Sequence, residues 1–465
     1  MVNKDNNQNC INRRDFMKFV GAGAATGAAL ATFGGRRGSD ASQVTKQDIP
    51  TDKMTYRVDP KNGNHLSLLG YGMMRLPRVP RRRGESLPDT DDIDQEAVNE
   101  LVDYAVAHGV NIFDTAPPYG KGFSERSTGE ALSRHPRDKY FISTKMSNVR
   151  PPSNREESIR MYNTSFESLR VDYIDYYLAH NLGDHASFKE RFLDNGILDF
   201  LFKEKEEGRI RNLGWSFHGD GDFFEYLASE YPWDFTLINL NYLGWGQDVM
   251  GFSNVNAQRQ YEILTERNIP AWIMGPLLGG GLSMPHYRAR ERMTQANSEA
   301  SAASWGFRFA GSLPNVTTVL SGMTFMDHLQ DNIRTFSPFA PLSDEERAML
   351  LGEISQIALE YRNINCTRCQ YCMPCPYGLD IPEIFSHYNR SLNEGNYPDD
   401  RQSEDFKRAR RAFLVGMDRR VSPLRQANRC TNCKLCMSPR CPQFINIPQE
   451  MRRIDKFVEE LKLEA

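Results

Sequence analysis

Cysteine is missing from most of this 465-residue chain: none of its nine cysteines lies between Cys10 and Cys366, and eight lie between Cys366 and Cys441. This distribution excludes a disulfide scaffold for the main body, because such scaffolds staple a small domain throughout its length. Strong net charge is missing too. The formal net charge is −3, which leaves no basic footprint for nucleic acid. With 40% hydrophobic and 25% charged residues, the composition is typical of a globular protein of two or three domains.

The chain also lacks an apolar run long enough to be a convincing transmembrane helix. The adjacent arginines Arg13 and Arg14 precede a weakly apolar stretch, residues 19–33, that is rich in Gly and Ala. This pattern resembles a bacterial twin-arginine export signal. We expect residues 1–41 to be the signal, with cleavage after Ala41. The mature protein would then be periplasmic or otherwise exported, without a stable membrane span. The alternatives are a frayed amphipathic N-terminus and a cytoplasmic protein.

Apolar strand-like runs alternate with helical patterns through the body of the chain. Val98, Leu101 and Val102 begin one apolar helix face, and Gly109 follows that helix. We expect eight strands, at residues 68–73, 110–113, 140–143, 173–178, 212–215, 236–240, 271–274 and 317–321. Eight strand-helix units predict an α/β fold, a (β/α)8 TIM barrel, over residues 54–340. A doubly wound sheet is the alternative, but no Gly-x-Gly-x-x-Gly follows an early strand, and we interpret the glycine run 279–281 as a loop.

Four polar residues lie at or just beyond the carboxyl ends of expected strands, where the chemistry of such barrels is located. Asp114 follows the second strand, with Tyr119 in the loop beyond it, Lys145 follows the third strand, and His180 follows the fourth. The alternative for each residue alone is a packed or structural side chain. The four together predict a catalytic set.

The segments around these residues resemble the aldo-keto reductase family. They are "LGYGMMRLP" from Leu69, "FDTAPPYG" from Phe113, "GFSERSTGEAL" from Gly122, "STK" from Ser143 and "DYYLAH" ending at His180. The resemblance implies an oxidoreductase that exchanges a hydride between a nicotinamide, NAD(P), and a small carbonyl or alcohol substrate. By this resemblance, Tyr119 is the acid-base and Lys145 lowers its pKa from the usual value of about 10. Asp114 is then the partner of Lys145, and His180 orients the substrate.

The expected nicotinamide pocket departs from the family pattern. Many aldo-keto reductases bind the carboxamide with a glutamine on the sixth strand, where this chain has Leu237; Asn239 or Asn241 is a substitute. The basic stretch that usually follows the eighth strand is also absent, since no Lys or Arg comes before Arg334. His218 lines the cofactor pocket or belongs to a capped loop. The other candidates for the pocket are Ser216, Gly275, Leu277, Ser321, Gly322, Met323 and Asn332.

The cysteines form two clusters, and each ends in Cys-Pro: Cys366-x2-Cys369-x2-Cys372-x2-Cys375-Pro376 and Cys430-x2-Cys433-x2-Cys436-x4-Cys441-Pro442. Three cysteines at successive x2 spacing can hold three corners of an iron-sulfur cube, and a remote Cys-Pro supplies the fourth. Zinc fits less well, because zinc sites pair two Cys-x2-Cys turns across a longer loop. Disulfides fit least, because residues three apart on a tight turn seldom meet the required geometry. We therefore expect two [4Fe–4S] clusters.

The segment "CTRCQYCMPCPYGLDIP" resembles the tail of the iron-sulfur branch of the aldo-keto reductases. The long insert between the clusters resembles an α-helical ferredoxin, which implies a ferredoxin-type domain over residues 343–465. In two-cluster ferredoxins the fourth cysteine of each run crosses to the other cluster. By that resemblance, one cluster takes Cys366, Cys369, Cys372 and Cys441. The other cluster takes Cys430, Cys433, Cys436 and Cys375.

These observations lead to three hypotheses. The first is an iron-sulfur oxidoreductase whose barrel transfers hydride and whose C-terminal domain relays electrons to or from a carrier protein. The second is an exported electron-transfer component whose barrel binds a ligand or partner without nicotinamide turnover. The third gives the clusters a purely structural role. Basic residues between the clusters offset cluster charge, dock an acidic carrier or form a solvated helix face; they are Lys407, Arg408, Arg410, Arg411, Arg419 and Arg420.

Overall fold

The computed structural model describes residues 49–79, 92–149, 154–219, 221–246, 257–361, 363–437, 440, 441, 443 and 445–464. The expected export signal and its cleavage site lie outside these residues. Within them, no helix is both long enough and apolar enough to cross a membrane.

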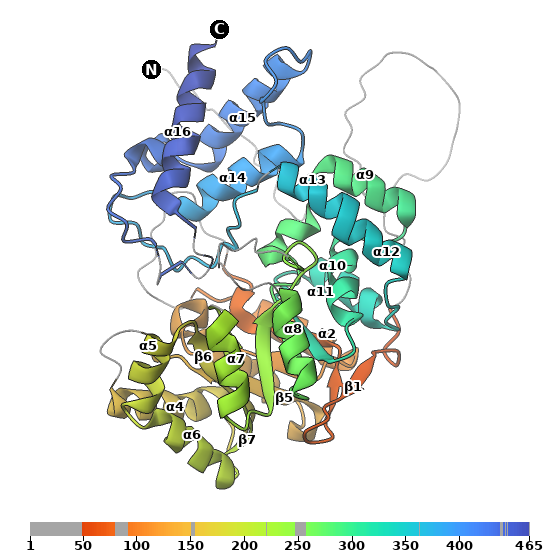
Figure 1. Ribbon diagram of the computed structural model, residues 1–465, viewed down its shortest axis with the longest axis vertical. Coiled ribbons are helices and arrows are strands. Elements are labelled where there is room, and N and C mark those ends of the chain that lie inside the picture. Colours follow the sequence, from red (N-terminus) through yellow and green to blue (C-terminus); the bar gives the residue numbers. More distant parts are fainter. Residues whose placement is uncertain are drawn as a thin grey trace, which may run out of the picture. The chain divides into compact units, whose positions relative to one another are not determined.

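A closed barrel of eight parallel strands forms the body of the described chain (Figure 1). The strands are β3 (Leu69–Gly72), β4 (Ile112–Asp114), β5 (Phe141–Met146), β6 (Ile174–Leu182), β7 (Ile210–Phe217), β8 (Phe235–Asn239), β9 (Ala271–Met274) and β10 (Val316–Ser321). Each overlaps one of the eight expected strands, and β10 closes the ring by pairing with β3 and β9. The predicted (β/α)8 barrel is therefore confirmed, because the alternation of apolar runs and helical patterns continues through a full ring.

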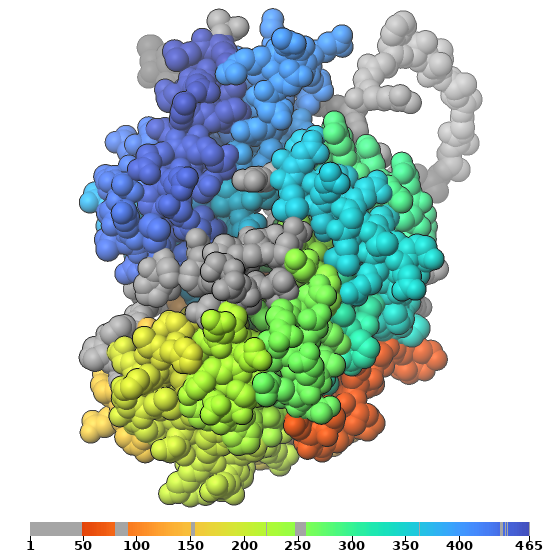
Figure 2. Space-filling view, in the orientation of Figure 1, coloured from red at the N-terminus to blue at the C-terminus, as the bar shows by residue number. Residues whose placement is uncertain are grey.

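Helices surround the barrel on its outer face. They are α2 (Gln95–Ala107), α3 (Ser124–Leu132), α4 (Arg155–Leu169), α6 (Ile197–Glu206), α7 (Gly221–Glu230), α8 (Ala257–Glu266), α10 (Ala302–Gly311) and α11 (Met326–Phe336). In α2 the Asp94 side chain accepts a hydrogen bond from the backbone N–H of Ala97, and the helix buries the expected face of Val98, Leu101 and Val102. Side chains of α7 and α8 form much of the yellow-green and green surface in Figure 2.

A hairpin of β1 (Tyr56–Val58) and β2 (His65–Ser67) covers the amino-terminal end of the barrel. The Asn64 amide donates to the Tyr176 hydroxyl at 3.0 Å, and the Asn62 amide donates to Asn212 Oδ1 at 2.8 Å. Tyr176 and Asn212 lie near the starts of β6 and β7. The opposite end, where the strands finish, is left for the candidate site.

A second apolar core lies in the C-terminal part of the chain. It is built on α14 (Ile381–Asn393), α15 (Phe406–Arg420) and α16 (Ile447–Leu463). The preceding helical stretch, α12 (Asp344–Met349), η6 (Leu350–Ile354) and α13 (Ser355–Glu360), still packs into the barrel core through Leu350 and Ile354. The apolar packing changes from one core to the other between Ile354 and Ile364, later than the boundary near residue 340 that the sequence indicates.

The C-terminal part contacts the end of the barrel where the strands finish. The Arg75 side chain, just after β3, donates a hydrogen bond to the carbonyl of Thr367. The Asn393 amide at the end of α14 donates to the carbonyl of Met284 at 2.7 Å. Met284 follows η5 (Leu278–Ser283), the turn that comes after β9. Because active sites of such barrels lie at this end, the cysteine-rich segment is placed beside the candidate site.

Candidate functional site

Asp114, Tyr119, Lys145 and His180 meet at one place. Asp114 ends β4, Lys145 lies in β5, His180 lies in β6, and Tyr119 begins η2 (Tyr119–Gly122). The Lys145 ammonium lies 2.7 Å from both Asp114 carboxylate oxygens and 5.1 Å from the centre of the Tyr119 ring. The Tyr119 and His180 rings meet edge to face, with their centres 6.0 Å apart. The structure thus brings together the four residues that the strand ends indicate.

All three donors of the Lys145 ammonium have acceptors inside the site. Two go to Asp114, and the third goes to the carbonyl of Thr115 at 2.6 Å. Burial lowers the pKa of Lys145, while the adjacent carboxylates of Asp114 and Glu125 act in the opposite direction. The ammonium therefore lies against the face of the Tyr119 ring and directs its hydrogen bonds elsewhere.

The expected lowering of the Tyr119 pKa is wrong for this geometry. Burial raises the pKa of Tyr119 well above its usual value, and Tyr371, Asp114 and Cys369 raise it further. The main cause is burial, which disfavours the charged phenolate, and the acidic and phenolic neighbours act in the same direction. Tyr119 is consequently held in its protonated form at neutral pH.

The imidazole of His180 is held neutral. Burial lowers the pKa of His180 well below its usual value, and the positive charge of Lys145 adds to the effect. Its Nδ1 atom is in hydrogen-bond contact with the hydroxyl of Ser147 at 2.5 Å. A neutral imidazole has one donor and one acceptor nitrogen. When Ser147 donates to Nδ1, Nε2 carries the remaining proton.

Three further residues at the site were not predicted from the sequence. Glu125 accepts a hydrogen bond from the Thr144 hydroxyl at 2.6 Å, and burial raises the pKa of Glu125. Tyr371 and Arg75 bring the cysteine segment to the barrel. Glu125 could have been singled out, because it lies in one of the family-like segments. Arg75 and Tyr371 lie in such segments too, but no local pattern indicates that they meet at the end of the barrel.

The expected pocket residues lie at three strand ends. At the end of β10, the Asn332 amide donates to the Ser321 hydroxyl at 2.9 Å, and the carbonyl of Met323 accepts from the Tyr71 hydroxyl at 2.5 Å. Gly275 and Leu277 follow β9. Ser216 lies in β7 and accepts from the backbone N–H of Asn181 at 2.8 Å, one residue beyond His180. Near it, burial lowers the pKa of His218 to about 4.

Of the two asparagines considered beside Leu237, the structure favours Asn239. Leu237 is 2% exposed and belongs to an apolar cluster inside the barrel, where it has no polar group to offer. Asn239 ends β8, and its Oδ1 is buried without a hydrogen-bond partner among the described residues. The side chain of Asn241 is instead used locally, because its oxygen accepts from the backbone N–H of Gly244 at 2.9 Å. A buried polar atom without a partner is rare in native structures and needs an explanation, such as a water, an ion or a functional role.

Arg75 brings a positive charge to the end of β10, where the sequence after the strand has none. Its side chain packs on Gly322, since a Cβ built at Gly322 would lie 3.1 Å from Arg75 Cδ. The same guanidinium donates to the carbonyl of Thr367. Burial lowers the pKa of Arg75, while Cys369 and Cys366 act in the opposite direction. Arg75 therefore connects the expected cofactor loop with the cysteine segment.

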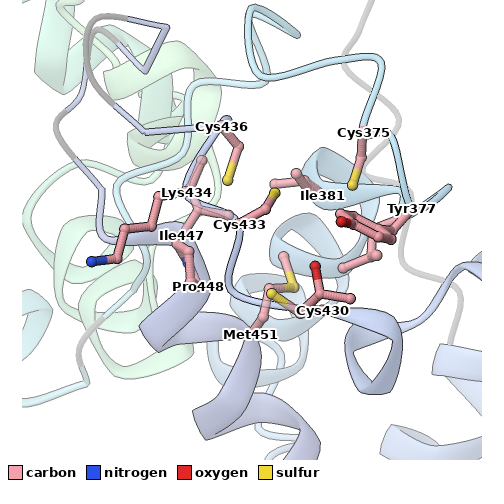
Figure 3. A pocket seen from close by; sticks show the side chains of 12 residues that line it. Cys375, Tyr377, Ile381, Cys430, Cys433, Lys434, Cys436, Ile447, Pro448 and Met451 are labelled. Atoms are coloured by element: carbon pink, nitrogen blue, oxygen red, sulfur yellow. The ribbon is translucent and has the colours of Figure 1, made fainter.

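The eight cysteines gather into two groups of four. Cys366 and Cys372 each lie within electrostatic range of Cys369 and Cys441. We call Cys366, Cys369, Cys372 and Cys441 the inner quartet, because Cys369 also lies within range of Tyr119. The outer quartet, Cys375, Cys430, Cys433 and Cys436, lines one pocket, and Figure 3 shows sulfur atoms turned toward its centre. The crossed grouping matches the two expected ligand sets.

The two Cys-x2-Cys-x2-Cys runs have the same backbone shape. Arg368 and Gln370 in the first run have positive φ angles of 55° and 66°, and Asn432 and Lys434 in the second have 59° and 63°. These are equivalent positions, two and four residues after the first cysteine of each run. Left-handed residues turn backbone N–H groups toward one side and form concavities for anions. One such N–H, that of Arg368, donates to Cys366 Sγ at 3.4 Å.

Each quartet contains a thiol whose surroundings disfavour the thiolate form, Cys366 in the inner quartet and Cys436 in the outer one. Burial raises the pKa of Cys366 to about 11 and that of Cys436 to about 11, and neighbouring thiolates contribute in the same direction. In the described part of the chain, no three His, Cys, Asp or Glu side chains are arranged around a single metal ion. The outer quartet lines a pocket, and a buried thiolate in either quartet is stabilised by a positively charged group beside it.

Half of the basic residues on α15 are used inside the C-terminal part. Arg408 donates to Asn396 Oδ1 at 2.7 Å, Arg410 donates to the carbonyl of Leu461 at 2.6 Å, and Arg420 lies 3.4 Å from Glu383. Lys407 and Arg411 are exposed. Packing within the domain, which is none of the three roles considered for these residues, accounts for this half.

Comparison with known proteins finds matches that cover the barrel. A family model described as "Aldo/keto reductase family" matches residues 68–352, which ends before the cysteines. L-galactose dehydrogenase of Arabidopsis thaliana is 22% identical over 335 residues, covering 67% of this chain and 97% of that protein. The "Probable aldo-keto reductase 1" of Glycine max is 27% identical over 194 residues, covering 40% of this chain and 51% of that protein. The chain thus spans about half the length of the soybean relative.

A solved structure supports the same fold. The holo form of an aldo-keto reductase from Bacillus halodurans superposes with a TM-score of 0.51 at 20% identity. The match covers 64% of this chain and 95% of that one. At this identity the likeness concerns the barrel fold.

Proposed function

This chain belongs to the aldo/keto reductase family of oxidoreductases, and we propose that it is an iron-sulfur member in which barrel chemistry is coupled to two [4Fe–4S] clusters. The substrate would be a small carbonyl or alcohol, exchanging a hydride with a nicotinamide. A bound nicotinamide would supply or accept the hydride, and each cluster would carry one electron. When a hydride is not passed on to a carbonyl, its two electrons would instead be divided between the two clusters and its proton would be released.

Around the reacting carbonyl, the described residues would supply protons and orientation. Tyr119, kept protonated by its surroundings, would donate to the substrate oxygen as negative charge develops there. His180, held neutral with Nδ1 against Ser147, would donate a second hydrogen bond from Nε2. Lys145 would place a positive charge against the Tyr119 ring, and Asp114 would fix the position of that charge.

The residues present fit a nicotinamide at the ends of β7 to β10. The unpartnered Oδ1 of Asn239 is suited to accept from a carboxamide N–H. Ser216, Gly275 and Leu277 would lie along the ring side, and Ser321, Gly322, Met323 and Asn332 along the phosphate side. Arg75 would supply the positive charge that the loop after β10 lacks. The choice between NAD and NADP would depend on whether Arg75 keeps its hydrogen bond to the carbonyl of Thr367.

The cysteine quartets fit iron-sulfur clusters by the chemistry of their donors. Four thiolates are the donors that hold a [4Fe–4S] cluster, and each quartet would supply four. Iron would supply the positive charge that the thiolates need. The matching left-handed turns in the two runs would present N–H groups to the cluster sulfurs, a contact that tunes reduction potential. The inner quartet would hold one cluster and the outer quartet the other.

The proposed coupling between the barrel and the clusters rests on one observation. Tyr119 lies within electrostatic range of Tyr371 and Cys369, which belong to the first cysteine run, more than 240 residues further along the chain. A cluster with a purely structural role would not need its ligands beside the acid-base residue of the barrel. Electron transfer between the barrel and the clusters requires this proximity.

The second candidate is an electron-transfer protein whose barrel does not turn over a nicotinamide. It is favoured by the apolar Leu237 and by the raised pKa of Tyr119. An exported location also favours it, because a nicotinamide pool is not expected there. Export itself is tested by following a tagged protein and its variant with Arg13→Lys and Arg14→Lys. Equal retention of both forms in the cytoplasm would exclude the twin-arginine route.

Iron and sulfide analysis of protein purified without oxygen tests the cluster part of the proposal. We expect about eight iron atoms and eight sulfides per chain, as two [4Fe–4S] clusters contain. In the crossed arrangement, Cys375→Ser disturbs the cluster held by Cys430, Cys433 and Cys436 and leaves the other intact. Loss of signal from the cluster of the first run, with the second unaffected, would overturn the arrangement.

A further inference from the structure

The two cysteine quartets differ in their access to solvent. In the inner quartet, Cys372 and Cys441 are buried, at 8% and 7% exposure. The outer quartet contains Cys433, the one exposed cysteine among the eight. Cys372 also lies within electrostatic range of Cys436, so the two quartets adjoin. The groups thus form a series that begins at Tyr119, passes through the inner quartet and reaches the surface at Cys433.

The surface around Cys433 is basic. The two cysteine-bearing stretches, residues 366–379 and 422–441, contain five cationic residues and no Asp or Glu. These cationic residues are Arg368, Arg425, Arg429, Lys434 and Arg440. Arg368 is paired with Glu383 at 3.4 Å and Arg425 with Asp380 at 3.5 Å. Arg429, Lys434 and Arg440 are exposed, and Figure 3 shows the Lys434 ammonium directed away from the cysteine sulfurs.

The same surface carries large apolar side chains. Tyr377, Leu424 and Leu435 are 50%, 71% and 57% exposed. Tyr377 lines the pocket of the outer quartet together with Cys433, and Leu435 is two residues beyond Cys433. Arg425, which follows Leu424, donates to the carbonyl of Gly378 at 3.2 Å and so places Leu424 near Tyr377. Exposed apolar residues surrounded by charges of one sign are typical of a protein-binding surface.

We propose that this surface, formed by Tyr377, Leu424, Arg429, Lys434 and Leu435, is the docking site of an acidic one-electron carrier protein. The inference rests on the proposed function, because it needs a cluster at the outer quartet. Each encounter would move one electron: the outer cluster is oxidised as the carrier is reduced, or the reverse, with no bond or proton transferred. The carrier would be acidic because the exposed charges it meets are positive.

The basic face of α15 is another positively charged surface, and it fits this role less well. Arg408, Arg410 and Arg420 are held by partners within the C-terminal part. Lys407 and Arg411 remain exposed there, but they lie outside the outer-quartet pocket. This makes them matched controls, since they are the same two residue types with the same exposure.

The test compares two charge-reversal variants of the full-length holoprotein. One carries Arg429→Glu with Lys434→Glu, and the other carries Lys407→Glu with Arg411→Glu. The probe is a purified acidic plant-type ferredoxin, and a basic cytochrome c serves as the probe of opposite charge. Binding is measured by calorimetry and electron exchange by stopped-flow absorbance at low and high salt. Iron content and reduction by dithionite are recorded for every protein.

We expect the Arg429/Lys434 variant to bind the acidic ferredoxin and exchange electrons with it roughly tenfold more weakly at low salt, and to lose most of the salt dependence. The Lys407/Arg411 variant should match the unaltered protein. Equal effects of both variants, or preference of the unaltered protein for cytochrome c, would overturn the docking site. Leu435→Ser, which leaves the charge unchanged, should also weaken binding. If the unaltered protein contains no reducible clusters, the proposed function itself fails, and the docking site fails with it.

Discussion

The Lys145 ammonium lies 2.7 Å from both carboxylate oxygens of Asp114, and the two residues are 0% and 3% exposed. A fully buried ion pair depends on both of its members, because either charge alone would be left without water or a counter-charge. The pair therefore stabilises the end of the barrel as well as positioning a positive charge beside Tyr119.

Removing one member of this pair should be costly. We expect Lys145→Met to lower the free energy of unfolding by roughly 3–5 kcal/mol, because it leaves the Asp114 carboxylate buried without a partner. Adding Asp114→Leu to that variant should restore part of the loss. Urea unfolding of the three proteins measures both effects. A double variant less stable than Lys145→Met would show that the pair is not a self-contained unit.

Tyr119→Phe separates carbonyl chemistry from electron storage. We expect carbonyl reduction to be lost, because the variant lacks the phenolic proton that Tyr119 would donate to the substrate oxygen. The iron content should not change, since the phenolic oxygen is not among the proposed ligands. Steady-state kinetics and iron analysis on the same preparation measure the two properties. Undiminished native redox activity in this variant would favour the electron-transfer candidate.

Gly275 should determine whether Asn239 can be placed for a nicotinamide. Gly275 has a φ of +65°, and a Cβ at this position would lie 2.3 Å from Asn239 Oδ1. We expect Gly275→Ala to weaken NAD(P)H binding about tenfold or more, an effect of roughly 1.4 kcal/mol. Gly208→Ala is the control, because Gly208 also has a positive φ, +81°, but nothing lies within 4 Å of its Cβ. Fluorescence titration with NADH and NADPH compares the cofactor affinities of the two variants. Equal affinities of Gly275→Ala and Gly208→Ala would argue against a role for Asn239.

The buried histidines should make the fold sensitive to acid. Burial lowers the pKa of His218 to about 4, whereas an unfolded histidine titrates near 6.5. Below pH 6.5 His218 is protonated in the unfolded chain, whereas in the folded chain it stays neutral until the pH nears 4. Stability is therefore fully present above that pH and is lost as the pH falls toward 4, by up to about 1.4 kcal/mol per pH unit.

His218→Asn tests this dependence. We expect its free energy of unfolding to decrease less steeply between pH 6.5 and 4 than that of the unaltered protein. Denaturant unfolding at several pH values gives the two slopes. Parallel slopes would mean that His218 is protonated in the folded state, contrary to its buried position.

The barrel and its four polar residues could be predicted because both depend on local order along the chain. Strand-like runs recur eight times, and Asp114, Lys145 and His180 each come at or just after the end of one of them. The crossed cysteine groups could be predicted from spacing and from their likeness to ferredoxins. In each case the residues that meet belong to a repeated pattern that places them at the same end of the fold.

The remaining features depend on packing between distant segments. No periodicity indicates that Tyr371 lies near Tyr119, or that Arg75 reaches Thr367. The direction of the Tyr119 pKa follows from burial and from the acidic and phenolic side chains that distant segments bring near it. The change of core between Ile354 and Ile364 was also hidden, because the helices before it are amphipathic and could pack on either side.

Anaerobic titration with NADH and NADPH is the most direct test of coupling between the barrel and the clusters. Cluster absorbance and electron paramagnetic resonance are followed in the unaltered protein and in Tyr371→Ala, which alters the contact beside Tyr119. The account predicts that one of the two nicotinamides reduces the clusters, and that the variant is reduced more slowly with its iron content unchanged. Clusters that are reduced by dithionite but do not respond to either nicotinamide would contradict it.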